Sequence, residues 1–177
     1  MVPGKRIAGL QRNPRKTRVD RDGTTRQITG WECVHIAIDD VTRLAYAEVL
    51  PDEKATTAIA FLRRALASFK RHGMHVQELL TDNGSAYKSA VHALACKALE
   101  IRHPRTRPRR PQTNGKAERF IRTMLSGWAY GAIYRDSTER TAALDGWLCT
   151  YNHRRPHHAI GRQTPINRMN NLLVSYS

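Results

Sequence analysis

The sequence predicts a single mixed α/β domain, from its length, its apolar content and the order of its expected elements. A chain of 177 residues suits one domain, and 40% hydrophobic residues are enough to form a core. Strands are expected first, followed by strands that alternate with helices, an order typical of mixed α/β folds. No internal repeat and no second domain is visible in the sequence.

Residues 1–30 are expected to form a basic arm with the remnant of a first strand or hairpin. Within them, residues 11–29 are polar and basic, contain an Asp-Gly turn signal, and suit a long hairpin connection or a flexible arm. The stretch WECVHIAIDD, residues 31–40, alternates between two apolar faces and predicts a strand buried on both sides. RLAYAEVL, residues 43–50, follows after a short turn, so these two strands are expected to pair as an antiparallel hairpin.

Helices and short strands alternate in the rest of the expected core, which covers residues 31–165 and is followed by a tail over 166–177. A strand that follows a crossover helix normally lies parallel to an earlier strand. The elements are expected in this order: a helix from Thr56 that ends at Gly73, a strand over 76–82, a helix over 86–98, a strand over 100–106, and helices over 114–128 and 137–152.

Positive charge dominates the composition. Thirty Lys and Arg face fifteen Asp and Glu, which gives a formal net charge of +15. A globular chain this basic usually binds a polyanion, because neutralising phosphates releases condensed counterions. The cations concentrate in residues 1–30 and 102–123, and the second segment contains one acid, Glu118. A ribosome-associated or merely solubilised protein is the other interpretation of this charge.

The three cysteines, Cys33, Cys96 and Cys149, lie far apart in apolar contexts. An odd number without a C-x-x-C pair argues against a disulfide framework and against a zinc knuckle, and predicts buried free thiols in a reducing compartment. The sequence shows no signal-peptide core and no apolar run of about 20 residues. We therefore expect a cytoplasmic protein that does not contact a membrane.

Asp82 and Glu118 are candidates for a shared site. Asp82 ends an expected strand, and the following Asn-Gly turn leaves its carboxylate at the sheet edge where ligands of α/β proteins collect. Glu118 lies at the border of the apolar stripe of its expected helix. Carboxylates on separate rigid elements can hold two Mg²⁺ or Mn²⁺ ions about 4 Å apart for phosphoryl transfer. Alternatively, Asp82 is a turn former and Glu118 pairs with Arg122 on its own helix.

Four stretches resemble the catalytic core of bacterial insertion-sequence transposases in the retroviral-integrase-like DDE superfamily. They are HIAIDDVTRLAYAEVLPDEKATTAIAFLRRAL, LLTDNGSAYKS, IRHPRTRPRRPQTNGKAERFIRTML and TYNHRRPHHAIGRQTP, in order from about Trp31 to Pro165. The resemblance implies a ribonuclease H-like fold, with a mixed five-stranded sheet flanked by helices. It also implies DNA cleavage and strand transfer at element ends, with Asp82 and Glu118 as catalytic acids that bind Mg²⁺ or Mn²⁺.

The chain departs from this family pattern at the first catalytic Asp. The resemblance places that acid on the first strand, a few residues before an apolar patch that corresponds to residues 5–10. Val2-Pro3-Gly4 stands there instead, and no acid precedes Asp20. Asp39 and Asp40 match an acidic pair of the family that is not the metal-ligand position. We expect an N-terminally truncated core with a shortened first strand, an incomplete two-metal site and impaired cleavage.

DNA is the expected partner, and the cations around Glu118 are the expected contacts. Lys116 lies off the apolar stripe and suits a phosphate contact, whereas capping explains Asn114 equally well. Tyr87 is expected beside the active site or simply in the core, and the three histidines of YNHRRPHHAIG match a packing segment rather than a zinc site. The predicted DNA contacts are Arg105, Arg107, Arg109, Arg110, Gln112, Asn114, Lys116, Arg119 and Arg122.

Three functions stay open on the sequence alone. The first is a DDE transposase core, and the second is a catalytically inactive DNA-binding remnant of one; metal-dependent strand cleavage separates them. The third is a ribonuclease H-type nuclease, which would hydrolyse RNA–DNA hybrids without joining strands. The family resemblance favours the first two, implies a bacterial protein at the nucleoid when bound to DNA, and is compatible with a homo-oligomer.

Overall fold

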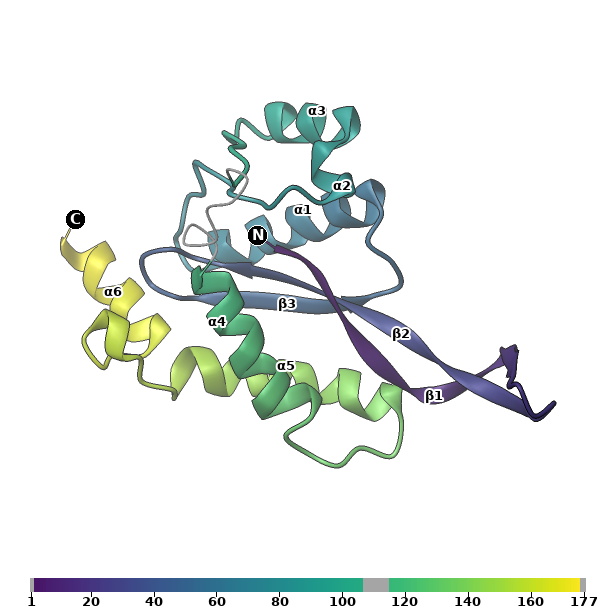
Figure 1. The fold of residues 1–177 in the computed structure, drawn as a ribbon. Helices are drawn as coiled ribbons and strands as arrows, with labels where there is room; N and C mark the ends of the chain where they lie inside the picture. Colours follow the sequence, from purple (N-terminus) through teal and green to yellow (C-terminus); the bar gives the residue numbers. More distant parts are fainter. Residues whose placement is uncertain (1, 107–114, 176–177) are drawn as a thin grey trace.

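The computed structural model describes residues 2–106 and 115–175, which form a three-stranded sheet between two layers of helices (Figure 1). The strands are β1 (Val2–Val19), β2 (Thr25–Ile38) and β3 (Ala45–Leu50). The helices are α1 (Ala55–Arg71), α2 (Ser85–Lys88), α3 (Ala90–Ala98), α4 (Gly115–Met124), α5 (Ser137–His153) and α6 (Pro165–Ser175). A π-helical turn, η2 (Leu125–Ala129), continues α4, and a 3-10 turn, η3 (His158–Ile160), precedes α6.

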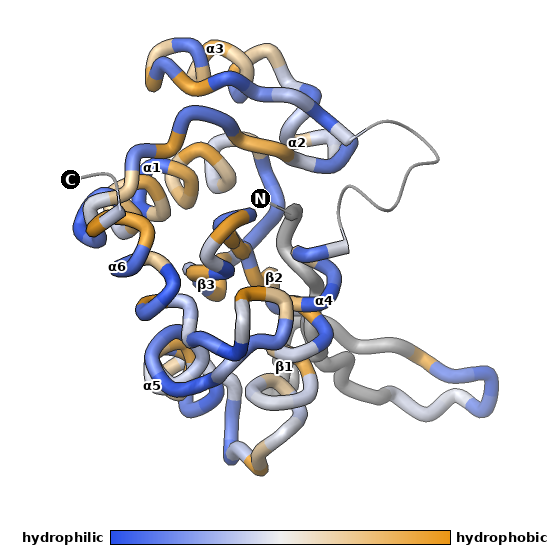
Figure 2. Tube along the Cα trace, turned by 90° about the vertical axis from the view of Figure 1, so that its left-hand side faces the viewer, coloured by the Kyte–Doolittle hydropathy of each residue, from blue (hydrophilic) through white to orange (hydrophobic). Residues whose placement is uncertain are grey.

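The sheet has the order β1-β2-β3 and is antiparallel throughout. β2 and β3 pair from Cys33↔Leu50 to Ile38↔Ala45, which confirms the hairpin expected from the alternation. β1 pairs with β2 through several register shifts and is 18 residues long, so it includes most of the segment assigned to the basic arm. The long β1–β2 hairpin projects from the body, and its tip is hydrophilic (Figure 2).

Each face of β2 packs against a different helical layer, because apolar side chains alternate along it. Val34 and Ile36 lie in one cluster with side chains of α4, η2 and α5. Ala37 lies in the other cluster with side chains of α1, and the ring of His35 lies 5.4 Å from that of Phe61 on α1. The predicted burial of this strand on both faces is therefore confirmed.

The expected mixed five-stranded sheet differs from the sheet observed in the described residues. The segments 76–82 and 100–106 were expected to be strands, but they pair only through isolated parallel bridges, Glu78↔Arg102 and Thr81↔Arg105. The described residues contain no ladder between these segments and β1. Backbone hydrogen bonds still join the two segments, from the Arg102 N–H to the Gln77 carbonyl and from the Thr106 N–H to the Thr81 carbonyl. Pro104 has no N–H to donate, which interrupts a regular ladder.

The helices follow the sequence periodicity with small differences in their bounds. α1 ends two residues before Gly73, which has the positive φ of 76° that favours glycine after a helix. The helix expected over residues 86–98 divides at Ser89, whose Oγ accepts the N–H of His92 at 3.2 Å and caps α3. Cys33 and Cys96 are buried free thiols as predicted, but Cys149 is exposed because it lies on the outer face of α5.

In the part of the chain that the structure describes, every helix is too short or too polar to cross a membrane.

Candidate nucleic-acid interface and acidic pair

Asp82 lies at the end of the bridged segment 76–82, in a tight turn. Its Oδ1 accepts the N–H of Gly84 at 2.8 Å, and the Asn83 side chain donates to the carbonyl of Thr106 at 2.8 Å. Thr106 in turn donates its N–H to the carbonyl of Thr81 at 2.8 Å. Asp82 therefore acts as a turn former, as the alternative interpretation expected, and it lies directly beyond the last bridge. Its role as a metal ligand stays a prediction.

Tyr87 is buried near two carboxylates, those of Asp82 and Glu53, whose charges affect its pKa. Burial raises the pKa of the Tyr87 phenol well above its usual range, and the negative charges of Asp82 and Glu53 add to that rise. Tyr87 is 2% exposed, and its ring meets that of His92 edge-on. Sequence reasoning did not single out Glu53, which lies just before α1 and carried no motif of its own.

Glu118 is exposed on the first turn of α4. Arg122, the expected partner on the same helix, forms no ion pair with Glu118 within 4.0 Å. The alternative in which Glu118 serves only its own helix therefore lacks its expected contact. A carboxylate at the N-terminal end of a helix also interacts favourably with the helix dipole.

A basic cleft of about 530 Å³ opens beside α4. Its described lining includes four Arg or Lys side chains and no Asp or Glu. The walls come from the end of β2 and the β2–β3 turn, one face of α4, and the segment from the end of α5 to η3. The charged and titratable lining residues are Arg43, Lys116, Arg119, Arg155, His157 and His158. Such a cleft suits the phosphates of a nucleic acid.

The structure brings some of the predicted contacts together at this cleft. Lys116 and Arg119 line it, whereas Arg122 is exposed on α4 and is not in its lining. Arg105 is exposed at the second parallel bridge. The remaining predicted contacts, Arg107, Arg109, Arg110, Gln112 and Asn114, lie outside the described residues. The convergence of Asp82 with Glu118 stays a prediction.

Lys116 is already paired within the protein. Its Nζ lies 2.5 Å from Oδ1 of Asp40 and donates to the Asp40 carbonyl at 3.3 Å. Arg43 also approaches the Asp40 carboxylate, at 3.8 Å. The neighbouring Asp39 has a different role, since its Oδ2 accepts the backbone N–H groups of Val41 and Thr42 and shapes the turn.

Sequence reasoning missed Arg43, Arg155, His157 and His158 as parts of a site. The last three belong to YNHRRPHHAIG, whose basic charge was the available signal, but the segment was interpreted as packing. Packing is indeed one role, because the His157 ring meets the Tyr151 ring edge-on at 4.8 Å. Burial lowers the pKa of His157, and the charge of Arg155 lowers it further.

The architecture is that of an integrase catalytic core with a ribonuclease H-like fold. The chain superposes on the crystal structure of the catalytic core domain of BIV integrase with a TM-score of 0.64. The superposition covers 82% of this chain and 91% of that one, at 23% sequence identity. Two family profiles described as Integrase core domain match residues 16–111 and 99–165. The first match covers more than half of the chain, so the chain belongs to the integrase core domain family.

Curated relatives come from insertion elements and a virus. The chain is 33% identical over 91 residues to an uncharacterized protein of insertion element IS136 in Agrobacterium fabrum, across 51% of this chain and 47% of the relative. It is 28% identical over 152 residues to ORF3 of Spiroplasma virus SpV1-C74, named a presumed integrase, across 78% of this chain and 42% of the relative. Transposase InsD of insertion element IS2 in Escherichia coli is 31% identical over 88 residues, half of this chain and 29% of the relative. The chain thus spans less than half the length of these relatives.

Proposed function

We propose that this chain is the catalytic core of a DNA transposase or integrase, which binds DNA and acts by metal-dependent strand cleavage and strand transfer. One observation carries the proposal: α4 presents Glu118 of the family motif and also forms a wall of the basic cleft, through Lys116 and Arg119. A DNA strand held by these cations would pass beside the carboxylate. The relatives named as a transposase and an integrase support the same function.

Asp82 and Glu118 fit a magnesium or manganese site by the chemistry of their donors. Carboxylate oxygens are the ligands that these hard cations prefer. The Asp82 carboxylate is held by the N–H of Gly84, and Glu118 is exposed on the first turn of α4. When bound, the ions would activate the attacking oxygen and stabilise the leaving oxygen of a phosphodiester. The protein's own contribution is to hold the carboxylates and to position the DNA backbone through the cations of the cleft.

The 177 residues contain no acid before Asp20, so the first acid of the family pattern is absent from them. Two carboxylates coordinate two metal ions incompletely, and phosphoryl transfer depends almost entirely on positioning and charge stabilisation. We therefore expect the 177-residue chain to bind DNA and to cleave it weakly. The alternative is a DNA-binding protein with no cleavage activity, which the same absence favours.

Binding and cleavage can be measured separately on this chain. Binding to a fluorescent DNA duplex is followed by anisotropy for the wild type, Arg119→Ala and Arg155→Ala, with Arg63→Ala as the control. Arg63 is exposed on α1, in the opposite helical layer, and lies outside the cleft. We expect each cleft variant to weaken DNA binding several-fold. The slope of log Kd against the logarithm of the salt concentration should also decrease by about one. Equal weakening by Arg63→Ala would show binding by net charge alone.

Cleavage is measured by nicking of the duplex with Mg²⁺ and with Mn²⁺. Weak nicking that disappears in both Asp82→Asn and Glu118→Gln, with unchanged DNA binding, supports a shared catalytic site. Nicking that persists in both variants contradicts a shared catalytic site. If the wild type does not nick DNA, the alternative of a DNA-binding protein without cleavage activity is supported. An RNA–DNA hybrid is included, because hydrolysis of the hybrid in preference to the duplex would indicate a ribonuclease H-type nuclease.

A further inference from the structure

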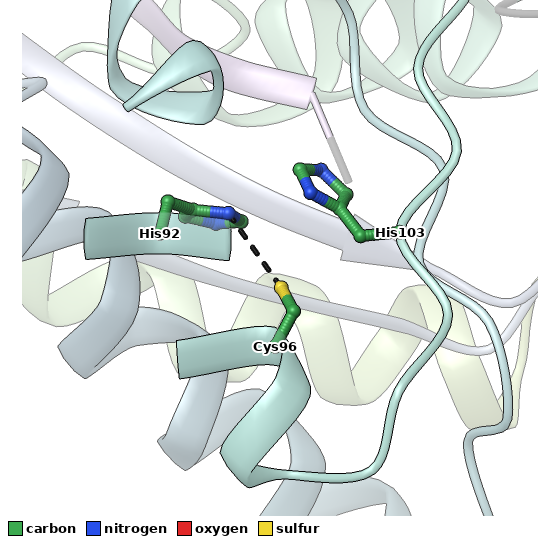
Figure 3. Close-up of side chains that lie close together, drawn as sticks. All are labelled: His92, Cys96 and His103. Carbon is green, nitrogen blue, oxygen red and sulfur yellow. Dashed lines mark hydrogen bonds between the residues drawn. The ribbon is translucent and has the colours of Figure 1, made fainter. Parts of the chain in front are cut away.

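Three side chains that could bind a transition metal lie together next to Thr81, the residue before Asp82. His92 and Cys96 come from successive turns of α3, and His103 comes from the bridged segment that follows it (Figure 3). One ligand atom from each residue lies within 4.8 Å of the other two. In the described residues this is the only group of three such side chains at this spacing. The i, i+4 spacing on a helix presents two ligands on one face.

The distance within the helical pair matches the geometry of a bound metal. Nδ1 of His92 lies 3.6 Å from Sγ of Cys96. Tetrahedral zinc with ordinary Zn–S and Zn–N bond lengths separates a sulfur from a nitrogen ligand by roughly 3.6 Å. The His103 ring stands 4.7 Å from the His92 ring, between centroids. Small side-chain rotations would therefore bring the third ligand to the same ion.

The surroundings of the cluster suit a metal better than a plain core. His92 and Cys96 are 0% and 1% exposed, so little water competes for their ligand atoms. Nε2 of His103 lies 2.8 Å from Oγ1 of Thr81, which fixes the ring in the way that outer hydrogen bonds fix metal-binding imidazoles.

A metal-free cluster explains part of this arrangement. The Cys96 thiol would donate to Nδ1 of His92, and the three rings of Tyr87, His92 and His103 would simply pack. Nε2 of His92 is buried without a described partner in either interpretation, because zinc bound at Nδ1 does not reach it. The metal-free interpretation gives no reason for a second imidazole beside a buried thiol.

We propose that His92, Cys96 and His103 bind one zinc ion, with a water molecule in the fourth position. Binding converts the Cys96 thiol to a zinc-bound thiolate and releases its proton to the solvent. The ion joins α3 to the segment 102–105, which pairs with the segment 76–82 through isolated bridges and not through a regular ladder. Imidazole and thiolate are softer ligands than the carboxylates of Asp82 and Glu118 and select zinc over magnesium. The inference does not depend on the proposed function.

The test uses the whole 177-residue chain, stripped of metal with a chelator, and titrated with Co²⁺ and then Zn²⁺. We expect a sulfur-to-cobalt charge-transfer band and tetrahedral d–d bands that saturate at one equivalent of Co²⁺ and vanish when Zn²⁺ displaces it. Zn²⁺ should also raise the Tm above that of the stripped protein. Cys96→Ser should abolish the charge-transfer band, and His103→Asn should weaken Zn²⁺ binding by at least about tenfold.

Cys149→Ser is the matched control. Cys149 and His153 repeat the i, i+4 pair on α5, but both are exposed and no third ligand completes a group with them in the described residues. The control should keep the cobalt spectrum, and each variant should match the stripped wild type in circular dichroism, which excludes simple misfolding. A charge-transfer band that survives Cys96→Ser or disappears in Cys149→Ser would overturn the proposal, as would no cobalt spectrum in the wild type.

Discussion

At the residue scale, Asp40 neutralises part of the positive charge of the basic cleft. Its side chain is 75% exposed and contacts Lys116 and Arg43, two of the four Arg or Lys residues in the lining. An exposed ion pair contributes little to stability, because solvent and salt screen it. The carboxylate does compete with phosphates for the same cations, so its main effect is on DNA binding.

Replacing Asp40 with Asn should strengthen DNA binding. The change releases Lys116 and Arg43 for phosphate contacts. We therefore expect a several-fold lower Kd, and a slope of log Kd against the logarithm of the salt concentration that is steeper by about one. Fluorescence anisotropy at several salt concentrations measures both. Asp52→Asn is the control, since it makes the same charge change at a carboxylate that pairs with Lys54, outside the cleft. Equal gains in the two variants would show a general effect of net charge.

His157 should make the protein less stable in mild acid. Its folded pKa lies below the ordinary value of 6.5, chiefly because of burial and also because of the Arg155 charge. As pH falls through about 6.5, the unfolded chain takes up a proton at this imidazole before the folded chain does, so the free energy of unfolding decreases. This contribution is fully present above that pH and is lost below it.

Denaturant unfolding at about pH 8 and about pH 5 tests this titration. His157→Phe keeps a ring against Tyr151 and removes the titrating group, so the decrease in the free energy of unfolding between the two pH values should become smaller. His158→Gln is the control, because His158 is exposed. An unchanged pH dependence in His157→Phe would show that His157 does not carry the effect.

At the element scale, the chain turns sharply between α4 and α5. The π-helical turn η2 ends at Ala129, and Trp128 is buried with its indole N–H donating to the carbonyl of Arg140 at 2.8 Å. Gly131 follows two residues after Ala129 and packs on the backbone of Ser126 and Gly127. A Cβ at Gly131 would lie 2.3 Å from the carbonyl oxygen of Ser126.

Gly131→Ala should therefore destabilise the protein, whereas Gly146→Ala should not. The contact at Gly131 is with backbone that cannot rotate away, so we expect a loss of roughly 1–3 kcal/mol in the free energy of unfolding. Gly146 lies within α5, where a Cβ would meet nothing within 4 Å. Alanine there should add about 0.5–1 kcal/mol. Urea unfolding of both variants measures the difference, and equal effects would contradict the close approach.

Local patterns were sufficient for most elements but not for the pairing of the short strands. The period of β2 and the apolar residues of α1 and α4 identify those elements directly, because burial imposes the spacing. The segments 76–82 and 100–106 have strand-like sequences, but strand pairing depends on a distant partner that local sequence does not specify. The cleft was missed for the same reason, since its walls come from three separate segments.

At the scale of the whole molecule, the net charge of +15 should make folding sensitive to salt. Like charges repel more strongly in the compact state than in the unfolded chain, and salt screens this repulsion. We expect the Tm to rise as NaCl increases from about 0.05 to 0.5 M. Thermal unfolding followed by circular dichroism measures it, and a Tm that stays constant or falls would show that pairs such as Arg64–Glu48 already balance the charge locally.

The sequence by itself determined the class of this protein: its β2–β3 hairpin and most of its helices, its excess of cations, and the spaced motifs around Asp82 and Glu118 that are typical of an integrase core. Those features are local or compositional, and local spacing and charge can be counted along the chain. Only the tertiary structure decided that Lys116 is paired with Asp40, that YNHRRPHHAIG forms the wall of a basic cleft, and that His103 lies beside His92 and Cys96. The Lys116–Asp40 pair and the walls of the cleft join segments that are distant in sequence, and His103 meets α3 through the turn that follows that helix. Counting residues along the chain specifies none of these contacts.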